Sequence, residues 1–476
     1  MTTPDPLMCA LPGPERLCAL LDALGAGLLE REHAVRLALL AALGGEHVLL
    51  IGPPGTAKSA LARRLHRAFA DTRWFERLLT RFSTPEELFG PLSLKALEDD
   101  RYERLTDGFL PTAGIAFLDE VFKANSAILN ALLTLLNERE FDNGSARTRT
   151  PLVAVVAASN EVPADEALQA FYDRFLVRVP VAAVGDDSFA ALLALPAEGD
   201  WPAAAPLAPA ERAAILQARS AVALDASFVA ACRQLRAWLA ERRQPLSDRR
   251  WRQIVALART AAVTEGRAVV DGYDLWLAPY VAAAEPASVP ALQAWFDSQV
   301  LALPAAEAPW LERAVQAFEQ QLGIEQSARD EAGDDGAGKL ALARAIGLGS
   351  GDAEPGMQRI VSARLEAQLH RRYSAVHIQA RVEQVAEVEA QVAAARRETA
   401  DRAAAQSAAL AGRLWLPPEL RRQLDARYAG ARALLDGLAG RLAEARAGFA
   451  ALPLDTAAAG GSAEAPAPVV LEPARP

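Results

Sequence analysis

The sequence predicts an α/β fold, with a parallel sheet flanked by helices, followed by a smaller all-helical domain and a C-terminal domain of long helices. Over the first 180 residues, short apolar runs alternate with helical patterns, which is typical of a parallel sheet. From residue 209 onward, apolar residues recur at helical spacing instead. With 476 residues the chain is too long for one core, and we expect about three domains.

The first part of the chain is expected to hold two helices and then five strands. Leucines recur at helical spacing over residues 14–45 and stop at two consecutive glycines. A helix is expected over 58–70. The strands are expected as short apolar runs near 47–51, 75–80, 115–118, 152–158 and 176–179.

The rest of the chain is expected to be helical, with Ala/Pro-rich connections. These connections are expected at 181–208 and 284–309, on either side of a helical lid. A helix at 310–328, a Gly/Asp-rich break at 331–356 and one long helix within 357–411 should follow, and a return helix should run from Pro417-Pro418 to about 450. We favour a self-packed helical hairpin without chemistry for the long pair. The expected domains are 1–185, 186–285 and 286–452, with a disordered tail at 453–476.

The composition narrows the class of protein. No apolar run of about 18 residues occurs, and the first 13 residues lack the layout of a signal peptide, so we expect a cytoplasmic protein without a membrane span. Nucleic acid is not expected as the main partner, because nucleic-acid binders concentrate positive charge and this chain has a net charge of −10. The cysteines Cys9, Cys18 and Cys232 have no metal-ligand spacing.

A phosphate-binding loop follows the first strand. Such a loop needs bare backbone N–H groups, a helix N-terminus, a Lys for the β/γ-phosphates and a hydroxyl for Mg²⁺. Lys58 and Ser59 supply the last two, so the sequence predicts ATP and Mg²⁺ as cofactors. The eight candidate residues are consecutive: Gly52, Pro53, Pro54, Gly55, Thr56, Ala57, Lys58 and Ser59.

Lys58 is one of only four lysines, against 50 Lys plus Arg in total, so its place in this loop is improbable by chance. A planar Arg cannot replace the compact ammonium there. Ala57 stands where the usual pattern has its last glycine, and we expect this position to keep negative φ. The alternative is an ordinary Gly/Pro-rich turn.

The apolar run from Ile115 to Leu118 ends in two carboxylates, Asp119 and Glu120. This is the layout of a Walker B strand, in which Asp119 would hold Mg²⁺ through water and Glu120 would polarise the attacking water. Without Lys58, an ordinary buried strand would explain the pattern equally well.

Three further polar residues are candidates for the same site. Asn160 follows a buried strand and would orient the attacking water, or else form a turn before Pro163. Arg174 precedes the last strand and would reach a neighbouring subunit's γ-phosphate, or else complement a helix dipole. One arginine after Ser247, such as Arg249, would face the nucleotide, or else lie on a solvated surface with Trp251 in the lid core.

This order of motifs resembles the AAA+ ATPases, and within them the MoxR family. GPPGTAKS at 52–59, FLDEVFKANSAILNALLTLLNEREFDNG at 117–144 and SNEVPADEALQAFYDRF at 159–175 are similar to the RavA-type regulatory ATPases. The resemblance covers roughly residues 15–285. It implies a hexameric ring with ATP between subunits, Arg249 acting in cis with Lys58, and Arg174 acting in trans. It also implies a partner with a von Willebrand factor A domain (ViaA-like).

The C-terminal part departs from this family's pattern. RavA-type proteins can carry a β-containing module that docks a lysine decarboxylase. No alternating strand pattern occurs between 330 and 415, so binding to a decarboxylase is not expected.

The segment 86–111 is expected to hold pore loops or family inserts. Its aromatic and apolar candidates for contact with a client are Phe89, Leu92, Tyr102 and Phe109, although buried packing is the favoured role for each. The turn Asp142-Asn143-Gly144 favours a tight hairpin.

The first functional hypothesis is a chaperone-like ATPase that remodels or matures protein complexes. A DNA-translocating motor would share the whole nucleotide site but is disfavoured by the acidic balance. A nucleotide-sensing scaffold with little turnover is disfavoured by Glu120.

Overall fold

The computed structural model describes residues 11–163, 165–196, 204–301, 309–328, 372–455 and 465–469. The chain divides into two compact units. Unit 1 comprises Met1–Ala302 and Leu410–Arg421, and unit 2 comprises Leu303–Ala409 and Arg422–Pro476.

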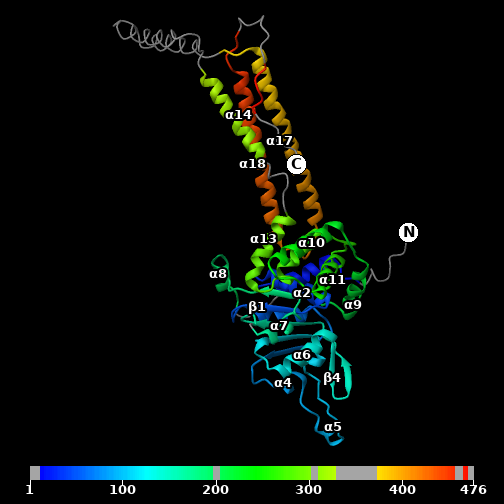
Figure 1. Cartoon of the computed structure of the whole chain (residues 1–476). Coiled ribbons are helices and arrows are strands. Elements are labelled where there is room, and N and C mark those ends of the chain that lie inside the picture. Colours follow the sequence, from blue (N-terminus) through cyan, green and yellow to red (C-terminus); the bar gives the residue numbers. More distant parts are fainter. Residues whose placement is uncertain are drawn as a thin grey trace, which may run out of the picture. The chain divides into compact units, whose positions relative to one another are not determined.

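Unit 1 is built around a five-stranded parallel sheet with the order β2-β3-β6-β1-β7 (Figure 1). All residues of β1 and β6 are buried, which explains why these strands read as continuous apolar runs. All five predicted strands are confirmed. Their bounds are β1 Val48–Ile51, β2 Trp74–Leu78, β3 Ile115–Asp119, β6 Ala154–Ser159 and β7 Val177–Pro180.

Helices cover the sheet on both faces. In β1, Leu49 and Ile51 share a buried cluster with Leu132 of α6 (Ser126–Glu138), and the alternate residues point to the other face. Helices α1 (Pro14–Gly25) and α2 (Glu32–Gly44) fall where two helices are predicted. The first helix after the phosphate loop is α3 (Lys58–Arg67), and α7 (Glu166–Tyr172) precedes β7.

A β-hairpin and a neighbouring loop extend from this core, near α4 (Pro85–Phe89) and α5 (Leu94–Glu98) (Figure 1). Strands β4 (Glu140–Asn143) and β5 (Ala146–Arg149) form the hairpin predicted at Asp142–Gly144. Asn143 holds the loop by accepting from the N–H of Arg104 at 2.7 Å and donating to its carbonyl at 3.1 Å. A Cβ on Gly144 would lie 2.0 Å from the carbonyl oxygen of Tyr102, so only glycine fits there.

The lid contains three main helices, α9 (Pro209–Ala218), α10 (Ala226–Glu241) and α11 (Asp248–Thr264). The prediction that 209–285 is wholly helical is wrong, because β8 (Ala223–Leu224) pairs in parallel with β9 (Val269–Val270). Strands of two residues are too short to show an alternating pattern of apolar and polar residues in the sequence.

Both predicted connections contain helices. Within 181–208 lies α8 (Asp186–Leu193), which has no buried residue, and within 284–309 lies α13 (Val289–Gln299). The buried face of α13 consists of Val289, Leu292, Trp295 and Phe296, which have helical spacing. Pro290 lies in its first turn, where proline is tolerated, so this proline does not mark a linker.

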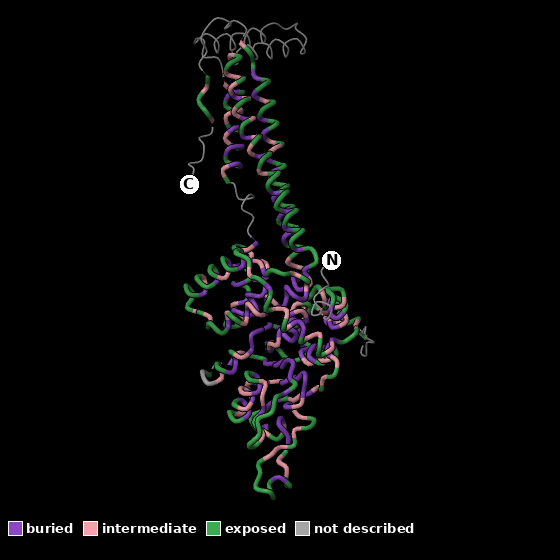
Figure 2. Tube along the Cα trace, turned by 90° about the vertical axis from the view of Figure 1, so that its right-hand side faces the viewer, coloured by how far each residue is buried: buried purple, intermediate pink, exposed green. Residues whose placement is uncertain are grey.

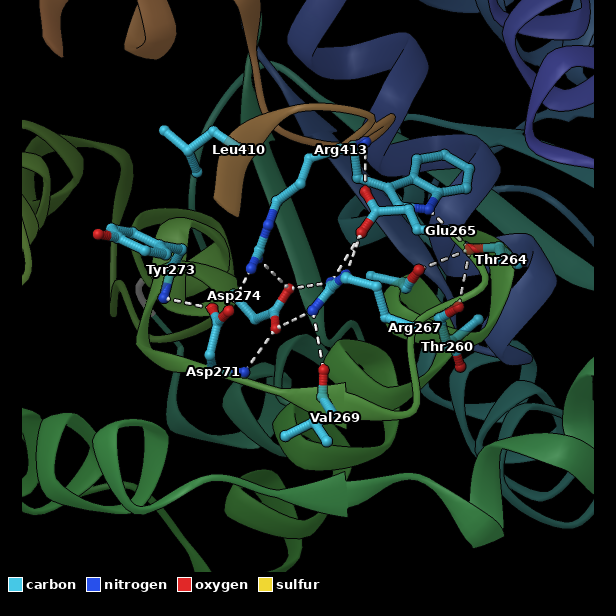
Figure 3. A network of polar contacts seen from close by, with 12 residues as sticks. Thr260, Thr264, Glu265, Arg267, Val269, Asp271, Tyr273, Asp274, Leu410 and Arg413 are labelled. Atoms are coloured by element: carbon cyan, nitrogen blue, oxygen red, sulfur yellow. Dashed lines mark hydrogen bonds and ion pairs between the residues drawn. The ribbon is translucent and has the colours of Figure 1, made fainter. Parts of the chain in front are cut away.

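The segment Leu410–Arg421 completes the lid through a buried polar network (Figure 3). The guanidinium of Arg413 forms ion pairs with Asp271 and with Asp274, the latter at 3.2 Å. The Trp415 backbone N–H donates to Glu265 at 3.0 Å, and the indole N–H donates to Thr264 at 2.7 Å. This C-terminal segment is therefore a structural part of the lid.

In the described residues of unit 2, three helices form a bundle: α14 (Pro309–Ser327), α17 (Ala375–Leu410) and α18 (Pro418–Ala450). Buried positions recur along the two long helices (Figure 2), and α14 contributes a third apolar face. The predicted hairpin of two long helices therefore packs with a third helix, α14. The core residues come from all three helices and include Val315, Phe318, Val385, Val388, Val392, Leu435, Leu438 and Leu442.

One prediction about the C-terminal part is confirmed and one needs correction. The long helix α17 lies within the expected range 357–411; it begins at Ala375, after Tyr373 forms a bridge with Leu454. The described part of the predicted disordered tail makes ordered contacts, since Val469 packs against the bundle and the Ala467 carbonyl accepts from Arg381. The predicted break at 331–356 lies outside the described residues.

Candidate functional site

The phosphate loop forms a narrow backbone cradle between β1 and α3. A Cβ on Gly52 would lie 1.9 Å from the carbonyl oxygen of Val181, so a glycine is required there. Gly55 has φ +78°, which again favours glycine. The expectation that Ala57 keeps negative φ is wrong, since its φ is +63°. A close approach at Gly52 and left-handed backbone at Gly55 and Ala57 thus shape the cradle.

Lys58 is buried at the start of α3 and lies inside this cradle. Its ammonium donates to the carbonyls of Gly52 at 2.7 Å and Pro53 at 2.8 Å, and no carboxylate of the described residues forms an ion pair with it. Burial lowers the pKa of Lys58, and the carboxylates of Asp119 and Glu120 act against this. An ammonium held by neutral carbonyls has capacity for an anion.

Glu120, Asn160 and Lys123 meet beside the cradle, because β3, β6 and β1 are neighbours and end at the same edge. The Asn160 amide donates to Oε1 of Glu120 at 2.6 Å. The Lys123 ammonium lies 3.2 Å from Oε2 of the same carboxylate. Glu120 has φ +52°, an unusual backbone for this residue type. Both oxygens of the predicted general base are therefore held in place.

Lys123 was not predicted as a functional residue. The signal available in the sequence was its rarity, since it is one of four lysines and follows Glu120 by three positions.

The residues present fit a magnesium nucleotide. Lys58, the backbone cradle and the start of α3 supply a phosphate site. Ser59 and Asp119 offer the hard oxygen ligands that Mg²⁺ prefers. Among the described residues, no cluster of His, Cys, Asp and Glu forms any other metal site.

Arg174 and Arg249 lie together at the opposite edge of the sheet. Arg174 precedes β7, and both burial and the nearby Arg249 lower the pKa of Arg174. The Arg249 guanidinium donates to Asn137, near the end of α6, at 2.9 Å. Strand β1 separates this amino edge from the phosphate loop by about 13 Å. The structure therefore brings the two arginines together but does not bring them to the phosphate loop of their own chain.

Arg250, the neighbour of Arg249, is a structural residue. It is buried and donates to the carbonyls of Val281 at 2.6 Å and Leu176 at 2.9 Å. It also lies 3.0 Å from the Asp173 carboxylate. Ser247 caps α11 as predicted, by accepting from the N–H of Arg250. Arg250 therefore fixes the lid to the strand that follows Arg174.

The predicted candidates for client contact divide by exposure. Phe89 is buried at 2% exposure, and Phe109 is partly buried against the same core. Tyr102 is 55% exposed, so the favoured packing role is wrong for this residue. It lies on the loop that Asn143 holds against the hairpin.

Two family models match the chain. Residues 15–213 match the family described as "MoxR domain in the MoxR-vWA-beta-propeller ternary systems", and residues 227–296 match "AAA lid domain". The first match contains Lys58, Glu120 and Arg174, and the second contains Arg249. These matches support the predicted resemblance to the AAA+ ATPases and to the MoxR family. Neither match distinguishes the RavA-type proteins within that family.

Curated relatives resemble part of the chain. Two uncharacterized proteins of Methanocaldococcus jannaschii are 51% identical over 164 residues, which is 34% of this chain and 44% and 43% of theirs. Protein MoxR of Paracoccus denitrificans is 31% identical over 169 residues, which is 34% of this chain and 48% of that protein. The chain therefore spans less than half the length of these relatives.

A crystal structure of a protein from Cytophaga hutchinsonii aligns with 59% of this chain and 94% of its own length, at 16% identity and a TM-score of 0.48.

Among the described residues of this chain, no helix combines the length and apolarity needed to cross a membrane.

Proposed function

We propose that this chain, in which a MoxR domain and an AAA lid carry the site residues, hydrolyses ATP as a MoxR-type AAA+ ATPase. The observation that carries this proposal is the convergence of Lys58, Glu120 and Asn160 at the carboxyl edge of three neighbouring strands. Open α/β sheets bind their ligands at this edge.

Each residue has a distinct role in the proposed reaction. The backbone of 52–58 and the Lys58 ammonium bind the phosphates, and Ser59 and Asp119 hold Mg²⁺. Bound Mg²⁺ and ATP supply the charge-neutralising metal and the transferable phosphoryl group. Glu120 polarises water, while Asn160 and Lys123 hold its carboxylate in position.

The active assembly is proposed to be a ring, in which Arg174 and Arg249 of one subunit serve the phosphates of the next. This moves Arg249 from the cis role that the resemblance implies to a trans role. Its support is the shared position of both arginines at the edge opposite their own phosphate loop. Arginines supplied in trans accelerate phosphoryl transfer by about 10³–10⁵. We propose a hexamer in the cytoplasm, the ring that the resemblance to the AAA+ ATPases implies.

The ring is proposed to remodel or mature protein complexes together with a von Willebrand factor A domain partner. The support is the description of the matched family, which names MoxR-vWA systems. Tyr102 and the hairpin β4–β5 are the proposed client contacts, because they are exposed and lie on one joined surface.

The test is the initial rate of Mg²⁺-ATP hydrolysis per chain across a dilution series, with Lys58→Ala as the blank. A shared active site predicts that the specific rate falls on dilution. Tight ATP binding without turnover at any concentration would instead favour a nucleotide-dependent scaffold.

The role of Glu120 has its own test. Glu120→Gln should bind ATP as wild type does and lose hydrolysis by at least about 10²-fold, because general-base catalysis contributes that much. An unchanged rate would remove Glu120 from the mechanism.

A further inference from the structure

A pocket of about 450 Å³ lies on the outer face of α11, against the short helix η4 (Arg219–Ala221). Three of its lining residues are arginines: Arg219, Arg252 and Arg259. We call it the arginine pocket. None of its lining residues belongs to the phosphate loop or to the strands that carry Glu120 and Asn160.

The lining of the arginine pocket is positively charged. No acidic residue lines it. Among the described residues, Arg252 and Arg259 have no hydrogen-bond or ion-pair partner, and the buried Nε of Arg259 is unsatisfied. Arg219 donates one N–H to the Gly44 carbonyl at 2.8 Å. An unsatisfied buried N–H is unfavourable, and a bound anion would supply the missing acceptor.

Further arginines surround the pocket. Burial and then the nearby Arg219 lower the pKa of Arg212. Burial raises the pKa of Glu46 to about 7, against the lowering effect of the nearby Arg139, Arg219 and Arg249. The positive charge here is locally concentrated, although the chain carries a net charge of −10. A hollow with one sign of charge attracts ions of the other sign.

The pocket also has an apolar, aromatic wall. Trp251 and Val255 lie on the same helix face as Arg252 and Arg259 and line the hollow. An indole offers a flat surface on which a planar ring can stack. Guanidinium groups match phosphate oxygens through paired N–H donors. The volume lies within the usual range of about 300–1,000 Å³ for small-molecule sites.

We propose that the arginine pocket binds a small phosphorylated molecule with a planar ring, of nucleotide size, at a second site separate from the phosphate loop. The arginines hold the phosphates and Trp251 stacks on the ring. Because this site does not need catalysis, the proposal is independent of the proposed function.

The experiment measures binding of mant-ADP, without Mg²⁺, to the full chain carrying Lys58→Ala, which silences the phosphate loop. We expect about one site per chain to remain. Arg252→Gln/Arg259→Gln in this background should weaken binding at least about tenfold, because it removes two charged hydrogen-bond donors to the phosphates. The matched control is Arg233→Gln/Arg236→Gln, two exposed arginines on α10 with the same change of charge. Trp251→Leu should weaken the binding of mant-ADP, because the ring loses its stacking surface. Pyrophosphate, which has no ring, should displace bound mant-ADP from this variant as well as it does from the parent chain.

Several outcomes would overturn the proposal. Among them are no mant-ADP binding to the Lys58→Ala chain and equal affinity in the arginine variant and its control. Displacement of mant-ADP by a single-stranded oligonucleotide more readily than by ADP would assign the pocket to nucleic acid. Sedimentation of each variant completes the test, because loss of assembly without loss of binding would assign the arginines to a second copy of the chain.

Discussion

Two residues of the nucleotide site have left-handed backbone although neither is glycine: Ala57 at φ +63° and Glu120 at φ +52°. Each costs about 1–2 kcal/mol relative to an ordinary conformation. Ala57 lies in the phosphate loop, and Glu120, the proposed general base, directly follows β3. They are two of seven non-glycine residues with positive φ in the described part of the chain. Two of these strained positions therefore lie at the proposed nucleotide site.

Ala57→Gly should raise the free energy of unfolding by about 1 kcal/mol, because glycine accepts positive φ without steric cost. Denaturant titration measures the change. The matched control is Ala213→Gly on an exposed face of α9, which should lower stability by about 1 kcal/mol. Destabilisation by both substitutions would contradict the strain at Ala57.

Glu46 should make the folded chain less stable as the pH rises. Burial raises the pKa of Glu46 from 4.5 to about 7, so between these values the unfolded chain has lost a proton that the folded chain keeps. We expect Glu46→Gln to raise Tm relative to wild type at pH 8 and to change it little at pH 5. Glu15→Gln, an exposed carboxyl on α1, is the control. A Tm difference that does not vary with pH would contradict the shift.

At the scale of elements, the lid depends on a segment that is distant in sequence. Asp274 and Trp415 are both nearly fully buried, and Arg413 pairs with Asp274 and Asp271 in the same network (Figure 3). Burial raises the pKa of Asp274, against the lowering effect of Arg267 and Arg413. Because these groups are largely shielded from water, each carboxylate and guanidinium group is stabilised in its charged form by the opposite charges beside it.

Arg413→Met should destabilise the chain by about 3 kcal/mol, because the buried Asp274 loses one of its two guanidinium partners and Asp271 loses its ion pair. Hydrogen exchange should show faster opening of the backbone at 410–421 and around Asp274. Arg432→Met, an exposed arginine on α18 without a described partner, should change neither stability nor exchange. Unchanged exchange at 410–421 in the Arg413 variant would show that Trp415 alone holds the segment.

At the scale of the whole molecule, the sheet separates the proposed catalytic groups into two sets. The carboxyl edge holds Lys58, Glu120 and Asn160, and the amino edge holds Arg174 and Arg249. One chain cannot bring both sets to one phosphate, because the strands lie between them. A second copy of the chain can supply the missing set.

Subunit mixing tests this division. Arg249→Ala and Lys58→Ala chains should each be inactive alone, and an equal mixture should recover about a quarter of the wild-type rate, since about one interface in four pairs two intact halves. Recovery would require Arg249 to act across the interface. Mixing two Arg249→Ala preparations is the control, and no recovery in the first mixture would place Arg249 in cis.

The sequence by itself determined the parallel sheet, the phosphate loop and the Walker B carboxylates. Buried parallel strands appear in the sequence as continuous apolar runs. The phosphate loop can be recognised because its lysine cannot be replaced by arginine. Only the tertiary structure decided which residues meet. The contact of Asn160 and Lys123 with Glu120 depends on strand order, and the position of Arg249 depends on where the lid packs. The docking of Arg413 into the lid joins residues about 140 positions apart, a distance over which local patterns carry no information.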